Sequence, residues 1–154
     1  MKVFISYSTD DISIVHTIAQ HVRPHAEVFY WDKSKVPGQE SWPIIFTWVD
    51  QADIVLALIT GKTVSRAMSV GQEIGHAKAK GKTIIPIVSP EVPSSELGFL
   101  SGITYQPIER NNPGPALESV KRVILAKKQQ IESNQAFLII GGILALLFIT
   151  ASGE

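Results

Sequence analysis

The side chain best suited to do chemistry in this sequence is Glu73, together with Ser69 four residues before it. Apolar residues recur around them at helical spacing, which predicts an amphipathic helix with Ser69 and Glu73 on one face. A carboxylate held beside a cleft can stabilise an oxocarbenium-like sugar and so assist cleavage of an N-glycosidic bond. A solvated acid on an exposed helix face fits the same pattern, so the residues alone leave both interpretations open.

Several other chemistries are excluded by composition. The chain has no cysteine, which excludes disulfides, thiolate metal sites and a cysteine nucleophile. It contains no Walker loop, no GxGxxG and no GxSxG motif. His21 and His25 are four residues apart and could form a metal pair. No carboxylate triad is evident near them, so we interpret them as solvated helix residues and expect no metal or cofactor. Lys+Arg and Asp+Glu both number 14, and this balance argues against a nucleic-acid partner.

The elements that must position Glu73 alternate between strands and helices. Apolar and β-branched runs predict strands at Lys2–Ser6, Glu27–Trp31, Ile54–Ile59, Thr83–Val88 and, as an edge strand, Ile103–Ile108. Helical spacing predicts helices at Ile12–Val22, Trp42–Val49, Val64–Lys80 and Ala116–Glu132, with Pro90–Ser101 as a loop. This order predicts a parallel sheet covered by helices on both faces, with sites in the crevice at the carboxyl ends of the strands.

The C-terminal part of the chain predicts a membrane anchor. No charged residue occurs from Ser133 to Gly153, and Ala136–Ala151 reads AFLIIGGILALLFITA. A helix of about 20 residues spans the hydrocarbon core of a bilayer. Basic residues precede this stretch at Lys121, Arg122, Lys127 and Lys128, which predicts that the N-terminal domain lies in the cytoplasm. A buried core helix or an apolar helix used for self-association is the alternative interpretation.

Four short motifs, in this order and at this spacing, resemble the TIR (Toll/interleukin-1 receptor) domain family of bacteria and archaea. The segment Phe4–Ser8 resembles the first strand box, and the loop with Val36-Pro37-Gly38 after Asp32 resembles the BB loop of the family. The remaining two motifs are Ala52-Asp53 before the strand at Ile54, and Ser65–Glu73 followed by Gly81–Pro86. The resemblance covers about residues 1–130. It implies a flavodoxin-like fold with a five-stranded parallel sheet. The hydrophobic length and flanking charge of the remaining chain predict a juxtamembrane linker at 131–135 and a transmembrane helix at 136–152.

The resemblance also implies an activity and a set of site residues. Members of the enzymatic branch cleave NAD with a glutamate on the third helix, a position that Glu73 matches. The implied reaction releases nicotinamide and leaves ADP-ribose or a cyclised form, with NAD+ as substrate and no separate cofactor. Tyr7 and Ser8 are expected to line the pocket, with Ser69 beside Glu73. Residues on or near the BB loop are expected to contact the nucleotide, although the last of them fits a core position equally well: Trp31, Asp32, Lys35 and Trp42.

Two other functions remain open at this point. A non-catalytic TIR scaffold would recruit other TIR domains by self-association. A nucleoside deoxyribosyltransferase-like enzyme shares the fold and the glutamate chemistry, but the Pro37-Gly38 motif argues against it. For the enzyme, the resemblance implies assembly through the BB loop, and a membrane tether would raise the effective concentration of neighbours. An NADase of this kind is expected in prokaryotic antiphage immunity or cell-death signalling.

Overall fold

The computed structural model describes the backbone of residues 1–32, 42–61 and 67–151. Within these ranges, the side chains of Thr9, Trp42 and residues 67–69 and 137–151 lie outside the description. The described strands are β1 (Lys2–Ser6), β2 (Glu27–Tyr30), β3 (Ile54–Ile59), β4 (Thr83–Val88) and β5 (Gln106–Pro107). The described helices are α1 (Ile12–Val22), α2 (Trp42–Gln51), α4 (Ala67–Ala79) and α5 (Gly114–Ala151), with short 3-10 helices η1 (Thr9–Asp11) and η2 (Ser94–Leu100).

The five strands form one parallel sheet in the order β2-β1-β3-β4-β5. The predicted α/β fold with a five-stranded parallel sheet is therefore confirmed. The middle strand β3 is buried along its whole length, because helices cover both of its faces. Its neighbours are set in register by pairs such as Ser6 with Ala57 and Ile59 with Val88. The carboxyl ends of β3 and β4 are therefore aligned, and β1 ends opposite Ala57, two residues before the end of β3.

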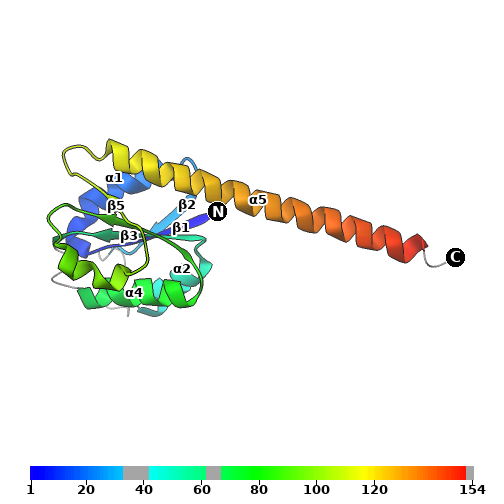
Figure 1. Cartoon of the computed structure of the whole chain (residues 1–154), viewed down its shortest axis with the longest axis horizontal. Helices are drawn as coiled ribbons and strands as arrows, with labels where there is room; N and C mark the ends of the chain where they lie inside the picture. Colours follow the sequence, from blue (N-terminus) through cyan, green and yellow to red (C-terminus); the bar gives the residue numbers. More distant parts are fainter. Residues whose placement is uncertain (33–41, 62–66, 152–154) are drawn as a thin grey trace.

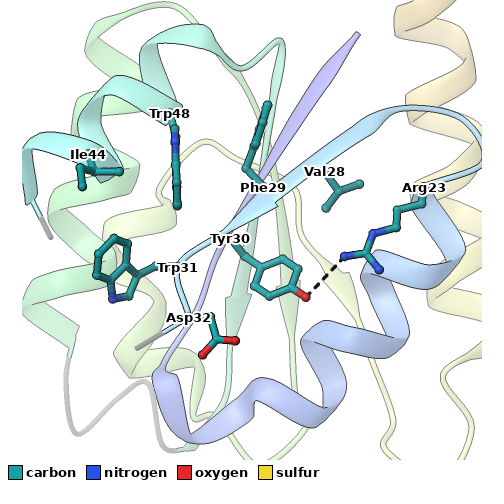
Figure 2. Close-up of a pocket in the computed structure, with 8 residues that line it drawn as sticks. All are labelled: Arg23, Val28, Phe29, Tyr30, Trp31, Asp32, Ile44 and Trp48. Atoms are coloured by element: carbon teal, nitrogen blue, oxygen red, sulfur yellow. Dashed lines mark hydrogen bonds between the residues drawn. The ribbon is translucent and has the colours of Figure 1, made fainter. Parts of the chain in front are cut away.

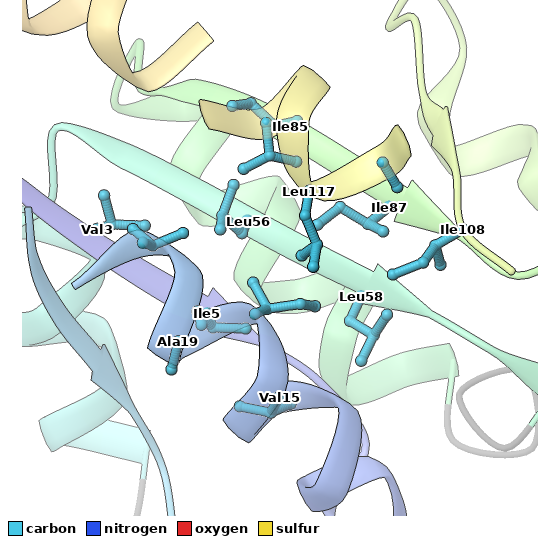
Figure 3. Packing of buried hydrophobic residues seen from close by; sticks show 14 of the residues in the cluster. Val3, Ile5, Val15, Ala19, Leu56, Leu58, Ile85, Ile87, Ile108 and Leu117 are labelled. Atoms are coloured by element: carbon cyan, nitrogen blue, oxygen red, sulfur yellow. The ribbon is translucent and has the colours of Figure 1, made fainter. Parts of the chain in front are cut away.

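Helices α1 and α5 cover one face of the sheet (Figure 1). Alternate strand residues point to this face, among them Ile5, Leu56 and Ile87, and they pack against Val15 and Ala19 of α1 (Figure 3). The first turns of α5 complete this cluster with Ala116, Leu117, Val120 and Ile124.

Helices α2 and α4 cover the opposite face (Figure 1). Here Phe4 and Val55 pack against Val49 of α2 and Ala77 of α4. Further toward the carboxyl ends of the strands, Ala57, Ile59 and Val88 pack against Val70 and Ile74 of α4. The amino end of α4 therefore lies over the carboxyl ends of the strands, and this arrangement positions Glu73.

Two predicted elements differ in the structure. The segment Pro90–Ser101, predicted as a loop, contains η2, which buries Leu97 and Leu100 against the end of β4. The predicted edge strand Ile103–Ile108 is reduced to the two residues of β5, and Pro107 cannot donate a ladder hydrogen bond. By contrast, the predicted end of the third helix is confirmed, because Gly81 follows α4 with a φ of 66°.

Helix α5 continues from the domain to Ala151 and extends well beyond the sheet (Figure 1). Residues 131–135, predicted as a linker, are helical within it. Among the described residues, no helix is both long enough and apolar enough to cross a membrane. The side chains at 137–151, which make up almost all of the predicted transmembrane segment, lie outside the description.

Candidate functional site

Glu73 lies on the inner face of α4 and is only 7% exposed. The residues that fix it there are its helix neighbours Val70 and Ile74, which are buried against the carboxyl ends of β3 and β4. The predicted helix is confirmed, but its acid is not a solvated one. Carboxylates are seldom buried this deeply without a pairing charge, so the position favours a functional role over an incidental one.

The electrostatics of Glu73 follow from this burial. Desolvation raises the pKa of its carboxyl to about 7, while the nearby Ser6 hydroxyl favours the ionised form and lowers that pKa in part. Within the described part of the chain, Glu73 Oε2 has no hydrogen-bond partner that meets full distance and angle criteria. A buried carboxyl that titrates near neutral pH and keeps an oxygen unpaired can receive a polar ligand.

Three serine hydroxyls near the carboxyl ends of the strands share this lack of a partner among the described groups. They belong to Ser6 at the end of β1, Ser8 just after it, and Ser89 just after β4. Each is at most 3% exposed. Unsatisfied buried hydroxyls cost stability, so their gathering at one edge of the sheet indicates a site built for polar contacts. Ser8 was predicted individually as a site residue, whereas Ser6 and Ser89 were predicted only as members of the segments at the carboxyl ends of the strands.

Tyr7 connects Glu73 to the residues that follow β2. Its phenol donates a hydrogen bond to the Trp31 carbonyl oxygen. Burial raises the pKa of Tyr7 well above its usual value, and the charges of Asp32 and Glu73 act in the same direction, as does Tyr30. The Tyr7 hydroxyl therefore stays protonated and lies within electrostatic range of both acids, which brings together three of the predicted site residues.

Trp31 and Asp32 also line a groove of about 360 Å³ along the outer edge of β2. Figure 2 shows it between β2 and α2, with Trp31, Trp48 and Phe29 forming an aromatic wall and Arg23 at the other end. The ring centroids of Trp31 and Trp48 are 6.0 Å apart. Of the described residues that line this groove, none is Glu73, so the predicted site residues lie in two neighbouring places rather than in one pocket.

A buried polar contact that the sequence did not predict fixes the start of α1. The Asp11 carboxylate accepts hydrogen bonds from Thr60 Oγ1 at 2.6 Å and from Arg110 Nη2 at 3.0 Å. The Asp11 side chain is fully buried, whereas that of Arg110 is about half exposed. This contact joins the segments that follow β1, β3 and β5, which holds the carboxyl edge of the sheet together. Arg110 is 99 residues from Asp11, so no local spacing could have indicated the pair.

On its outer side, α4 is attached to α2 through His76. The His76 Nε2 atom lies 2.8 Å from Asp50 Oδ1, and its ring stacks on Phe46 at 4.6 Å between centroids. The hydrogen bond from His76, aided by Lys80 and Lys82, lowers the pKa of Asp50. His76 is one helical turn after Glu73, so this contact joins α2 to the part of α4 that follows Glu73.

Three predicted site residues cannot be placed in the site. Lys35 lies outside the described residues, and so do the side chains of Trp42 and Ser69, although their backbones begin α2 and lie within α4. His21 lies 3.4 Å from Glu118 on α5. Across the described ranges, no group of three or more metal-binding side chains is present.

Comparison with known proteins identifies the family. The sequence model of the TIR domain matches residues 3–124. The chain belongs to the TIR domain family. The TIR match covers all five strands and the packed part of α5, and it ends before the apolar C-terminal segment. No curated protein matches the sequence.

Solved structures share this TIR fold at low sequence identity. The TIR heterodimer of RPS4 and RRS1 superposes with a TM-score of 0.63 at 11% identity, covering 82% of this chain and 98% of that one. A CMP N-glycosidase of Clostridium botulinum, BcmB, gives 0.56 at 20% identity over 79% and 98% of the two chains. A 2-deoxyribosyltransferase of Bacillus psychrosaccharolyticus gives 0.54 at 17% identity over 68% and 85%. At these identities the likeness shows the fold, which is found both in TIR assemblies and in enzymes named for chemistry at glycosidic bonds.

Proposed function

We propose that this TIR protein is an NAD+ glycohydrolase in which Glu73 is the catalytic residue. The observation that carries the proposal is the buried Glu73 carboxyl at the carboxyl ends of the strands, with one oxygen unpaired among the described groups and a pKa raised to about 7. Its position matches that of the glutamate of enzymatic TIR domains. A glutamate with no function would ordinarily be exposed to solvent on the helix surface, with an ordinary pKa.

In the proposed reaction the bond between the ribose anomeric carbon and the nicotinamide nitrogen breaks. Its electron pair neutralises the positively charged ring, and the ribose becomes oxocarbenium-like. The Glu73 carboxylate contacts the ribose hydroxyls and stabilises this positive charge in a site with little water, where a charge acts strongly. Water then adds to the anomeric carbon and loses a proton, giving ADP-ribose and nicotinamide. Attack by a nucleophile within the nucleotide would give a cyclic product instead.

The neighbouring residues support binding of the dinucleotide. The hydroxyl of Ser8 and the phenol of Tyr7 lie on the segment that follows β1, and the charge of Glu73 acts on Tyr7. Trp31 offers an aromatic face for a base, and Asp32 follows it. We assign Lys35, Trp42 and Ser69 to the same nucleotide site by family position.

A glutamine substitution tests this assignment with little change in shape. We expect Glu73→Gln in the full chain, reconstituted on liposomes to favour clustering, to lower NAD+ cleavage at least about 100-fold, because the carboxylate charge acts mainly in the transition state. Released nicotinamide, measured by chromatography, is the readout. Glu27→Gln is the matched control, because Glu27 is exposed at the amino end of β2.

Two results would count against the proposal. If the wild-type protein leaves NAD+ intact under clustering conditions, the proposed NAD+ glycohydrolase activity is wrong. If Glu73→Gln cleaves NAD+ as fast as wild type and Glu27→Gln, Glu73 is not the catalytic residue.

The second candidate function is a non-catalytic TIR module that acts by self-association. The similarity to a TIR heterodimer is the observation that favours it. We infer that this chain also assembles through its TIR domain and BB loop. Assembly and catalysis would then both be properties of this protein rather than alternatives. A Glu73→Gln variant that assembles normally but does not cleave NAD+ would separate them.

We further propose that residues 136–152 anchor the protein in a bilayer, with the TIR domain in the cytoplasm. The support is the uncharged apolar stretch and the basic residues before it. Helix α5 contains most of this stretch and extends away from the domain (Figure 1). A tethered TIR domain that depletes NAD+ fits a role in prokaryotic immune or cell-death signalling.

A further inference from the structure

Ser6 is the buried group whose place in the fold is tied most directly to Glu73. It is the last residue of β1 and is only 1% exposed. Successive side chains of a strand point to opposite faces, so Ser6 points to the same face as Phe4, which packs against α2 and α4. The Ser6 side chain therefore faces the helix that carries Glu73.

The register of the sheet also shows which part of α4 the Ser6 side chain faces. Ser6 pairs with Ala57 of β3, and Ala57 packs against Val70 and Ile74. These two residues flank Glu73 on α4, so the Ser6 hydroxyl lies beneath the helical turn from which the carboxyl projects.

The two side chains have complementary hydrogen-bonding capacities. Ser6 Oγ carries a donor, and Glu73 Oε2 is an acceptor. Both are buried, and among the described groups neither atom has a partner with full hydrogen-bond geometry. The serine is nevertheless close enough to act on the carboxyl, because it lowers the Glu73 pKa against the effect of burial.

We propose that Ser6 is a positioning residue for Glu73, whose hydroxyl donates to the carboxylate, keeps it ionised and holds it toward the bound sugar. This inference rests on the proposed function and extends it to a residue to which the sequence assigned no role of its own. Its physical basis is that a hydrogen bond to the charged form of an acid favours that form, which the transition state requires. Without the serine, burial acts alone and the acid stays neutral to a higher pH.

The test compares Ser6→Ala with Ser89→Ala in the full chain in lipid nanodiscs. Both serines are 1% exposed and lack a described partner at the carboxyl end of a strand, Ser6 as the last residue of β1 and Ser89 just after β4. Only Ser6 acts on the Glu73 carboxyl. The Glu73 titration is followed through the 13C carboxyl resonance of labelled glutamate, assigned by its absence in Glu73→Gln. We expect Ser6→Ala to raise the Glu73 pKa by about one pH unit and Ser89→Ala to leave it unchanged.

The pH dependence of kcat/KM for NAD+ cleavage, measured on liposomes where the chains can cluster, is the second readout, since it reports ionisation of the free enzyme. We expect its acid limb to move upward in Ser6→Ala by the same amount, so that activity falls about tenfold at pH 6 and recovers above pH 8. Thermal unfolding checks that both serine variants remain folded. An unchanged Glu73 titration in folded Ser6→Ala, or an equal shift in Ser89→Ala, would overturn the inference. A protein that shows the titration shift but never cleaves NAD+ would overturn the proposed function and leave the Ser6 contact established.

Discussion

At the scale of single residues, the proposed chemistry depends on an acid that burial keeps from ionising readily. Glu73 is 7% exposed, and desolvation raises its pKa to about 7. The same burial that prepares it for a ligand costs stability whenever the acid is ionised in the folded protein. Function and stability are therefore opposed at this position, as expected for a group placed for binding rather than for packing.

This opposition gives a pH-dependent prediction for Glu73→Gln. The folded protein holds the Glu73 proton up to about pH 7, whereas the unfolded chain loses it near the ordinary pKa of 4.5. The free energy of unfolding of the wild type therefore falls as the pH rises from 4.5 to 7, and then levels off. We expect Glu73→Gln to be more stable than wild type by up to about 3 kcal/mol at pH 8, and nearly equal to it at pH 4.5.

Denaturant unfolding of both proteins at pH 4.5, 6 and 8 measures this difference. Glu27→Gln controls for the loss of one negative charge from an exposed site. If the gain from Glu73→Gln is the same at all three pH values, the carboxyl does not titrate as its burial implies.

The sequence supports part of this residue-level description. Helical spacing places Glu73 on a face, and family resemblance assigns it a role, but neither shows whether that face is buried. The contribution of Ser6 depends on the pairing of β1 with β3, because the register with Ala57 sets it beneath α4. Such register depends on contacts between segments some fifty residues apart, which no local pattern encodes.

At the scale of elements, prediction succeeds where the local pattern agrees with burial. The runs Ile54–Ile59 and Thr83–Val88 are strands as predicted, because β-branched residues that are apolar on both sides fit the middle of a covered sheet. The segment around η2 was missed, since prolines and serines dominate its local signal while Leu97 and Leu100 are held by tertiary packing. Tertiary contact outweighed turn chemistry there.

The contact of Asp11 with Thr60 and Arg110 gives a prediction at this scale. Because the Asp11 side chain is fully buried, removal of the Arg110 cation leaves a charge in the interior with only Thr60 as its described donor. We expect Arg110→Met to lower the free energy of unfolding by about 2 kcal/mol, less than for a fully buried pair because Arg110 is half exposed.

Arg122→Met is the matched control, since Arg122 is exposed on α5. Denaturant unfolding at pH 7 compares the two variants. An equal and small effect of both substitutions would show that the buried pair contributes nothing specific to the carboxyl edge of the sheet.

At the scale of the whole molecule, α5 belongs to two regions with different surroundings. Its first turns complete the core through Leu117, Val120 and Ile124, and its later turns leave the sheet altogether (Figure 1). A continuous helix transmits orientation as well as position, because it has no flexible linker to absorb rotation. If the C-terminal segment is embedded in a bilayer, the TIR domains are held at a similar height and in a limited range of orientations.

Removal of residues 133–154 tests this arrangement. The truncated chain keeps the α5 residues that pack on the sheet, so we expect its thermal unfolding midpoint to stay within a few degrees of that of the full chain. The full chain should float with liposomes in a density gradient, whereas the truncated chain should remain at the bottom.

With liposomes present, NAD+ cleavage at low protein concentration should fall at least about tenfold on truncation and recover as the concentration rises, because tethering confines neighbours to a plane. Equal flotation of the two chains would contradict the anchor, and equal activity at every concentration would show that clustering in the membrane is not what completes the site.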